Sequence, residues 1–202
     1  MSKRTKKVFL SLLCFILLVL GSKFFIDRMR VDNLYRHGFQ LYEEQIATYL
    51  KEHYSGISKI EFSPIFKSGE NGEGFVYARI VPVVYDTYGN KVYLRNDGVL
   101  KMGVADYEMA AGIDLDFNVN DGSEIIYLRN DQKESISVES YQNLPDELKL
   151  NKDEITDEAM EAFSREGHLK GVEKNDQGSP QAEIVYNLEI RRVQGREFYE
   201  WK

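Results

Sequence analysis

The stretch AGIDLDFNVNDGSEIIYLRN, from Ala111 to Asn130, decides between two interpretations of this chain. Two Asp and two Asn occupy alternate positions, and a third Asp, a Gly and a Glu follow them. Such a stretch is either a calcium-binding loop or a β-hairpin with an acidic face. The first alternative predicts a metal protein, and the second predicts a surface that meets another protein.

The calcium loop of an EF-hand requires the pattern D-x-[DN]-x-[DN]-G and a Glu at the twelfth place. Counted from Asp114, the sixth residue is Val119 and the twelfth is Ile125. Counted from Asp116, the Gly comes one place late and the twelfth residue is Tyr127. Both registers therefore fail at the two positions on which the fold of the loop depends.

The hydrophobic residues favour the hairpin. Apolar and polar residues alternate strictly from Ile113 to Asn120, which is typical of a strand with one buried face. Side chains two residues apart in a strand are separated by about 6.8 Å, which is too far for successive side chains to hold one ion. NDGS then supplies a turn and EIIYL a return strand. A calcium site at the tip, formed by Asn120, Asp121 and Glu124, remains the alternative.

The amino terminus predicts a membrane segment. Four basic residues precede an apolar run, Val8–Leu20, that is interrupted only by Ser11 and extends past Lys23 to Ile26. This run of about nineteen residues approaches the roughly twenty that span a bilayer as a helix. We expect an uncleaved signal anchor at residues 8–26. A signal peptide cleaved near Gly21 is the alternative.

Two further features of this segment narrow its interpretation. Cys14 follows Leu13 in the middle of the run, whereas lipidation of a Cys requires a small residue before it. The basic tail favours the cytoplasmic side. We therefore expect a single-pass membrane protein, with residues 1–30 forming the tail and anchor and residues 31–202 an extracellular domain.

Charge divides the chain sharply. The first 23 residues hold 5 of the 26 Lys and Arg and none of the 33 Asp and Glu, so residues 24–202 carry 21 basic and 33 acidic side chains, a net charge of −12. This acidity argues against nucleic acid and against a domain that lies flat on anionic lipid. It is compatible with plain solubility and with a face for a basic protein partner.

The spacing of apolar residues predicts further helices and strands. Apolar residues recur at helical steps from Asp32 to Tyr54, and Gly56 ends this helix. SKIEFSPIF (58–66) and FVYARIVPVVYD (75–86) predict strands, the second with Pro82 at an edge or a bulge. TYGN then turns the chain into KVYLRND, as in a hairpin.

The last fifty residues predict one helix and two strands. Thr156 is the expected N-cap of a helix that Gly167 ends. Residues 182–190 also alternate, with Val185 as the exception, and EFYEW follows a QGR turn as the partner in a last hairpin. The order predicts an α+β fold: an N-terminal transmembrane helix continuing into a helix, then a curved antiparallel β-sheet of hairpins with a short packing helix.

Signatures of catalysis are missing from the sequence. His37 and His53 lie sixteen residues apart on one helix, too far to share a metal, and His168 follows the Gly that ends the second helix. No H-E-x-x-H, Cys pair or G-x-S-x-G motif occurs. We therefore expect no enzyme, no metal site and no cofactor. A hydrolase that uses an unrecognised pair of carboxylates is the remaining alternative.

The layout resembles a known family. The basic start, the membrane segment, LYEEQIATYLKEHYSGISKIEF and the β-rich remainder are similar in arrangement to the TipC-type immunity proteins of type VII secretion systems in Gram-positive bacteria. The resemblance implies a membrane-anchored, outward-facing protein that neutralises a secreted antibacterial toxin. It covers the architecture and carries over no functional residue.

We therefore predict a membrane-anchored immunity protein that binds a secreted protein toxin with a basic surface. The predicted partner-binding residues are Asp114, Asp116, Asn118, Asn120, Tyr127 and Arg129. The alternative is a cell-envelope accessory or structural protein that acts through its stalk and membrane segment.

Overall fold

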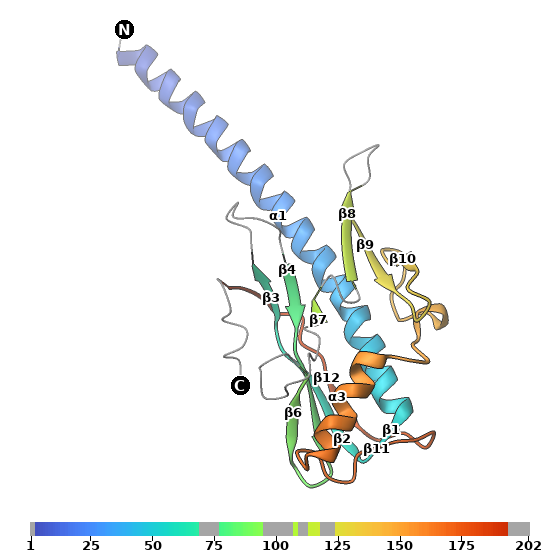
Figure 1. The fold of residues 1–202 in the computed structure, drawn as a ribbon. Coiled ribbons are helices and arrows are strands. Elements are labelled where there is room, and N and C mark those ends of the chain that lie inside the picture. Colours follow the sequence, from blue (N-terminus) through green and yellow to red (C-terminus); the bar gives the residue numbers. More distant parts are fainter. Residues whose placement is uncertain (1–2, 69–76, 95–106, 109–112, 118–123, 194–202) are drawn as a thin grey trace.

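The computed structural model describes residues 3–68, 77–94, 107–108, 113–117 and 124–193 (Figure 1). Within these ranges, some residues are described by their backbone alone, namely residues 3–11, 24, 27, 77, 107–108, 113–117 and 124.

One long helix, α1 (Lys3–His53), forms the axis of the molecule (Figure 1). It includes all but the last residue of the helix predicted from Asp32 to Tyr54, since Tyr54 already belongs to a strand, and it continues toward the amino terminus without a break. Gly56 follows it with a φ of +78°, and a Cβ there would collide with the backbone carbonyl of Gly171. Among the side chains that the structure describes, no helix combines the length and the hydropathy of a membrane-spanning segment.

Strands and one short helix follow α1, so the α+β class is confirmed. The strands are β1 (Tyr54–Ser55), β2 (Ile57–Phe62), β3 (Ile65–Ser68), β4 (Tyr77–Ile80), β5 (Pro82–Asp86), β6 (Lys91–Tyr93), β7 (Tyr107–Glu108), β8 (Ile113–Phe117), β9 (Glu124–Arg129), β10 (Ser135–Ser137), β11 (Glu173–Lys174), β12 (Glu183–Val185) and β13 (Ile190–Arg192). The helices after α1 are the 3₁₀ turn η1 (Asp146–Leu148) and α3 (Glu154–Arg165).

The expectation of one antiparallel sheet is wrong. The described strands form four small sheets, in the orders β12-β2-β5-β6, β13-β3-β4-β7, β10-β9-β8 and β1-β11. Two of these sheets are mixed, because β12 pairs with β2, and β13 with β3, in the parallel direction.

The chain passes from one of the first two sheets to the other between β2 and β3, at Ser63, and again between β4 and β5, at Val81. These two residues are hydrogen-bonded to each other. The buried Ser63 accepts a hydrogen bond from Val81 N at 2.8 Å through its hydroxyl, and its own N–H donates to Val81 O at 3.0 Å. Pro82 is the first residue of β5. Proline has no N–H to donate to a neighbouring strand, and the first position of a strand is one of those that tolerate this. Of the two predictions for Pro82, an edge or a bulge, the edge is wrong, because β5 lies between β2 and β6; Pro82 follows the break between β4 and β5.

The strand predicted at residues 182–190 is also divided. Its two halves, β12 and β13, are separated by residues 186–189. These halves run beside β2 and β3, which are themselves interrupted at Ser63 and Pro64, so the neighbouring strand has to break at the same level. The hairpin predicted for EFYEW lies outside the described residues.

The short helix α3 is amphipathic, and its buried side chains pack into the same core as α1. Its N-cap is Asp153, whose carboxylate accepts a hydrogen bond from Thr156 N, so the prediction of Thr156 as the cap is wrong. Gly167, with a φ of +78°, follows the last turn as predicted.

Candidate functional site

The predicted acidic hairpin is confirmed. Strands β8 and β9 pair antiparallel, with Asp114 directly opposite Tyr127 and Asp116 directly opposite Ile125. Directly opposed residues project on the same side of a sheet, so positions 114, 116, 125, 127 and 129 share one face. Asn118 and Asn120 lie outside the described residues, as does the proposed calcium tip at Asp121.

The opposite face of this hairpin is buried against α1. The alternate residues Ile126 and Leu128 are fully buried in the main core, whereas Ile125, Tyr127 and Arg129 are half-buried. Figure 1 shows β8 and β9 beside the middle of α1. We call the face that carries positions 114, 116, 125, 127 and 129 the outer face of the hairpin.

Two hydrogen bonds hold α1 against this sheet. Gln45 Nε2 donates to the carbonyl oxygen of Arg129 at 2.9 Å, and His37 Nε2 lies 2.8 Å from the carbonyl oxygen of Val138. Strand β10 extends the outer face, because Ser137 pairs with Tyr127 and Ser135 with Arg129. The outer face is thus the side of a three-stranded sheet that is turned away from α1.

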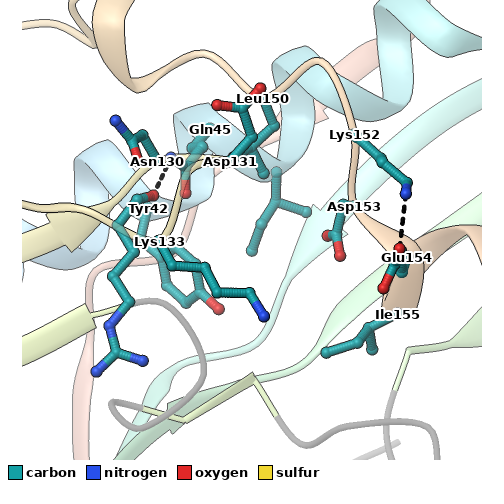
Figure 2. Close-up of a pocket in the computed structure, with 12 residues that line it drawn as sticks. Tyr42, Gln45, Asn130, Asp131, Lys133, Leu150, Lys152, Asp153, Glu154 and Ile155 are labelled. Atoms are coloured by element: carbon teal, nitrogen blue, oxygen red, sulfur yellow. Dashed lines mark hydrogen bonds and ion pairs between the residues drawn. The ribbon is translucent and has the colours of Figure 1, made fainter.

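A groove of about 470 Å³ begins at Arg129. Three segments line it: α1, the turn between β9 and β10, and the residues that lead into α3. Figure 2 shows Asn130, Asp131 and Lys133 on one side and Lys152 to Ile155 on the other. The groove and the outer face therefore meet at Arg129.

The floor of the groove belongs to α1. Tyr42, Gln45 and Ile46 line it, and their exposed fractions are 4%, 2% and 3%. The Gln45 amide also donates to the carbonyl oxygen of Leu148 at 2.6 Å, so its two N–H groups connect β9 with the chain before α3.

A tight turn forms one rim. Asn130 holds this turn, because its Oδ1 accepts from Glu134 N at 2.9 Å and its Nδ2 donates to Glu134 Oε2 at 3.1 Å. Within the turn, Lys133 adopts a φ of 64°, the left-handed region that side-chain-bearing residues rarely occupy. Lys133 is the one non-glycine residue in this region among those the structure describes.

Charged residues form the other rim. Lys152 Nζ lies 2.6 Å from Glu154 Oε1, and this ion pair lowers the pKa of Glu154 and raises that of Lys152. Asp153 Oδ2 accepts from the Thr156 hydroxyl at 2.5 Å. These carboxylates are therefore already bound within the protein.

A second polar cluster lies at the far end of α1. The hydroxyls of Tyr49 and Tyr54 donate to Asp157 Oδ1 at 2.7 and 2.6 Å, and Lys174 Nζ donates to Oδ2 at 2.6 Å. Burial alone would raise the pKa of Asp157, but the hydrogen bonds from Lys174, Tyr54 and Tyr49 outweigh it and lower that pKa. The cluster fastens α3 and β11 to α1.

The strand register puts the positions of Asp114 and Asp116 on the same face of the hairpin as those of Tyr127 and Arg129. The structure also adds the groove, which sequence reasoning missed. One signal for it was present: Gln45 is a polar residue on the otherwise apolar face of a helix. Among the described residues, no group of three or more His, Cys, Asp or Glu could hold a metal ion.

Comparisons of the chain with protein-family models, with curated proteins and with solved structures give no match.

Proposed function

We propose that the chain is a membrane-anchored immunity protein that binds and neutralises a secreted antibacterial toxin outside the cell. Neutralisation takes place by stoichiometric protein contact through the outer face of the β8–β9 hairpin. The observation that supports this most is the strand register, because it puts Asp114 and Asp116 on one face with Tyr127 and Arg129. Tyrosine and arginine are the residue types that dominate the energetics of protein interfaces.

Charge supports a basic partner. Residues 24–202 carry 21 basic and 33 acidic side chains, and two of the acids occupy adjacent same-face positions of β8. An acidic surface attracts a basic partner from a distance, which raises the association rate. A face of about 800 Å² per partner is the common size of a stable interface. The outer face and the groove together offer a continuous surface for such contact.

The anchor is the second part of the proposal. In the amino-terminal third of α1, large apolar side chains project outward, with Leu12 57%, Phe15 64% and Leu18 71% exposed. A helix that is apolar on all sides is stable only when it is surrounded by apolar matter. We assign residues 8–26 to the bilayer, residues 1–30 to the tail and anchor, and residues 31–202 to the extracellular domain.

The test uses the full chain in detergent micelles and a candidate toxin, chosen as a large secreted protein whose gene neighbours the gene of this chain. The double variant Asp114→Lys and Asp116→Lys should bind the toxin at least tenfold more weakly, with a flatter salt dependence. The control is Glu158→Lys with Glu161→Lys, which makes the same charge change on exposed positions of α3. Equal affinities for the parent and the hairpin variant would refute the assigned face.

One observation favours the envelope accessory function. Arg192 Nη2 lies 2.9 and 2.7 Å from the two carboxylate oxygens of Asp32, and Lys67 Nζ lies 3.8 Å from one of them. These contacts fix the stalk to β3 and β13 close to the anchor, as a protein that works through its stalk requires. Replacement of residues 8–26 by an unrelated anchor discriminates, because toxin neutralisation should survive the exchange and a membrane-partner function should not.

A further inference from the structure

Glu43 carries the one buried side-chain oxygen or nitrogen without a hydrogen-bond partner in the part of the chain that the structure describes, namely Oε1. The residue is fully buried on α1, and its other oxygen, Oε2, accepts from Asn187 N at 3.1 Å. A charged carboxylate in such a place is costly, because one backbone N–H replaces only part of the hydration that burial removes. Burial accordingly raises the pKa of Glu43 to about 8, although the bond from Asn187 opposes the change.

The elements around Glu43 supply no compensating charge among the described residues. The next residue on α1 is another acid, Glu44, and no described cation contributes to the pKa shift of Glu43. Tyr186 faces both acids, because burial and then the charges of Glu44 and Glu43 raise the pKa of its hydroxyl. The other charged groups of β2, β3 and the chain around β13 form ion pairs elsewhere: Lys59 with Glu61, Lys67 and Arg192 with Asp32, and Arg191 with Glu189.

Asn187 belongs to a segment, residues 183–193, that is only loosely held. It comprises β12, the crossover at residues 186–189 and β13, and none of its residues is fully buried. Both strands lie at the ends of their sheets, and each pairs with its neighbour over three residues. Segments with little buried surface open locally at a lower free energy than the core unfolds. We call residues 183–193 the edge segment.

The crossover covers Glu43. Asn187 donates its backbone N–H to Glu43, and its side-chain Oδ1 accepts from Glu189 N at 3.2 Å, which fixes the crossover as a turn. Next to it, the Tyr186 ring stacks on Phe62 with a centroid distance of 6.1 Å. Opening of the edge segment therefore removes the single hydrogen-bond donor of Glu43 and gives water access to its carboxyl group.

We propose that Glu43 is a proton-dependent latch that holds the edge segment closed on α1. With the proton bound, the neutral side chain tolerates burial, and the segment stays in place. Loss of the proton leaves a charge that water stabilises better than the closed structure does, so the segment opens. Opening uncovers the edges of β2 and β3, because β12 and β13 are their neighbours at the ends of the two sheets.

The pH dependence of this opening has a defined sign. The closed state keeps the proton up to about pH 8, whereas the open state releases it near the ordinary value of 4.5. Closure is therefore most favoured below pH 4.5 and is lost progressively as the pH rises toward 8. The equilibrium constant for opening should rise by about tenfold per pH unit in the middle of this window. Between pH 5 and about 8 the total rise should be roughly 300-fold.

Hydrogen exchange measured by mass spectrometry tests the latch. The full chain in detergent micelles is exchanged into D₂O at several values between pH 5 and about 8, and the rates are corrected for the intrinsic pH dependence of amide exchange. We expect the protection of a peptide that covers the edge segment to fall roughly 300-fold over this range. Protection that stays constant over the whole range would overturn the proposal.

Variants assign the effect to residue 43. Glu43→Gln keeps the size of the side chain and cannot ionise, so the protection of the edge segment should no longer depend on pH. Glu43→Met, which removes the ionisable group in a different way, should give the same result if Glu43→Gln folds poorly. Glu44→Gln is the matched control and should keep the dependence of the parent. An unchanged dependence in both variants of Glu43 would refute the latch.

Urea separates local opening from global unfolding. The comparison peptide covers β5, which lies in the middle of its sheet and contains the fully buried Val84. Low, non-denaturing concentrations of urea should accelerate exchange of the β5 peptide and leave the edge segment almost unaffected, because local opening exposes little surface. Equal protection and an equal response to urea in the two peptides would show that the edge segment opens only when the whole domain unfolds, which would also refute the latch.

Discussion

Glu43 makes the stability of this protein depend strongly on pH. Its side chain is fully buried on α1, where Oε2 accepts a hydrogen bond from Asn187 N at 3.1 Å. Its other oxygen, Oε1, is buried without a hydrogen-bond partner among the described residues. Burial raises the pKa of this carboxyl from 4.5 to about 8, although the bond from Asn187 opposes the change.

The direction of the effect follows from the protons that each state binds. Between pH 4.5 and about 8 the folded chain keeps the proton on Glu43, whereas the unfolded chain releases it. The contribution to stability is therefore complete below the unfolded pKa and is lost as the pH rises through the folded pKa. In the middle of this window each pH unit lowers the free energy of unfolding by about 1.4 kcal/mol. Because the slope is smaller near either pKa, the whole window removes about 4 kcal/mol.

Glu43→Gln should abolish this dependence. The carboxamide can still accept from Asn187 N, but it leaves its NH₂ group without an acceptor at a cost of about 1 kcal/mol. We expect the variant to be less stable than the parent by about 1 kcal/mol near pH 5. Near pH 8 it should be more stable by about 3 kcal/mol, because the parent has by then lost about 4 kcal/mol.

The assay is urea denaturation of the full chain in a mild detergent, followed by far-ultraviolet circular dichroism between pH 5 and about 8. Other ionisable groups contribute equally to parent and variant, so the difference between the two isolates residue 43. Glu44→Gln is the matched control, since the half-buried Glu44 carboxylate accepts from Leu144 N at 2.9 Å. Parallel stability curves for the parent and Glu43→Gln would refute the reasoning.

Three further changes have defined outcomes. Lys133→Gly should raise the free energy of unfolding by about 1 kcal/mol by relieving the left-handed conformation, whereas Lys133→Ala should not. Asp157→Asn should cost about 2 kcal/mol at neutral pH, because Tyr49, Tyr54 and Lys174 lose a charged acceptor. This difference should shrink as the pH falls below 3.8 and through the lower folded pKa, since the parent then also loses its carboxylate. Gly56→Ala should cost about 3 kcal/mol, because the new Cβ meets the Gly171 carbonyl. An unchanged urea midpoint in Lys133→Gly, Asp157→Asn or Gly56→Ala would contradict the expectation for that variant.

The elements that sequence reasoning predicted correctly are those whose pattern depends on one buried face. The alternation from Ile113 to Phe117 predicted a strand, and the pairing of Asp114 with Tyr127 confirms the hairpin. The helical steps after Asp32 predicted the second half of α1. In both cases the local spacing of apolar residues is sufficient to predict the type of element and its buried face.

The failures arose where the partner of a segment decides its structure. Alternation in residues 182–190 is the same beside a parallel or an antiparallel neighbour, so it could not reveal that β12 and β13 run parallel to β2 and β3. The break between β12 and β13 is set by Ser63 and Pro64, far away in the chain. Asp153 and Thr156 are both good capping residues, and only the folded backbone shows that Asp153 takes this place.

The groove was beyond prediction for the same reason. Gln45, Lys133 and Ile155 belong to three segments that are remote in sequence and meet only in the fold. The polar Gln45 on an apolar helix face indicated locally that its side-chain amide needs hydrogen-bond partners from another segment. It gave no indication of which segments would surround it.

The uninterrupted course of α1 has a mechanical consequence. The helix rises about 1.5 Å per residue, so the part from Ile26 to His53 acts as a stiff lever about 40 Å long. The ion pairs of Asp32 with Lys67 and Arg192 fasten β3 and β13, which belong to one sheet, to this part of the helix. If residues 8–26 lie in a bilayer, a tilt of about 20°, the average for such helices, would swing the far end by roughly 14 Å. Rotation of the membrane segment about the helix axis would rotate the β8–β9 hairpin about the same axis. Motions inside the membrane would therefore determine the direction in which the hairpin points along the membrane surface.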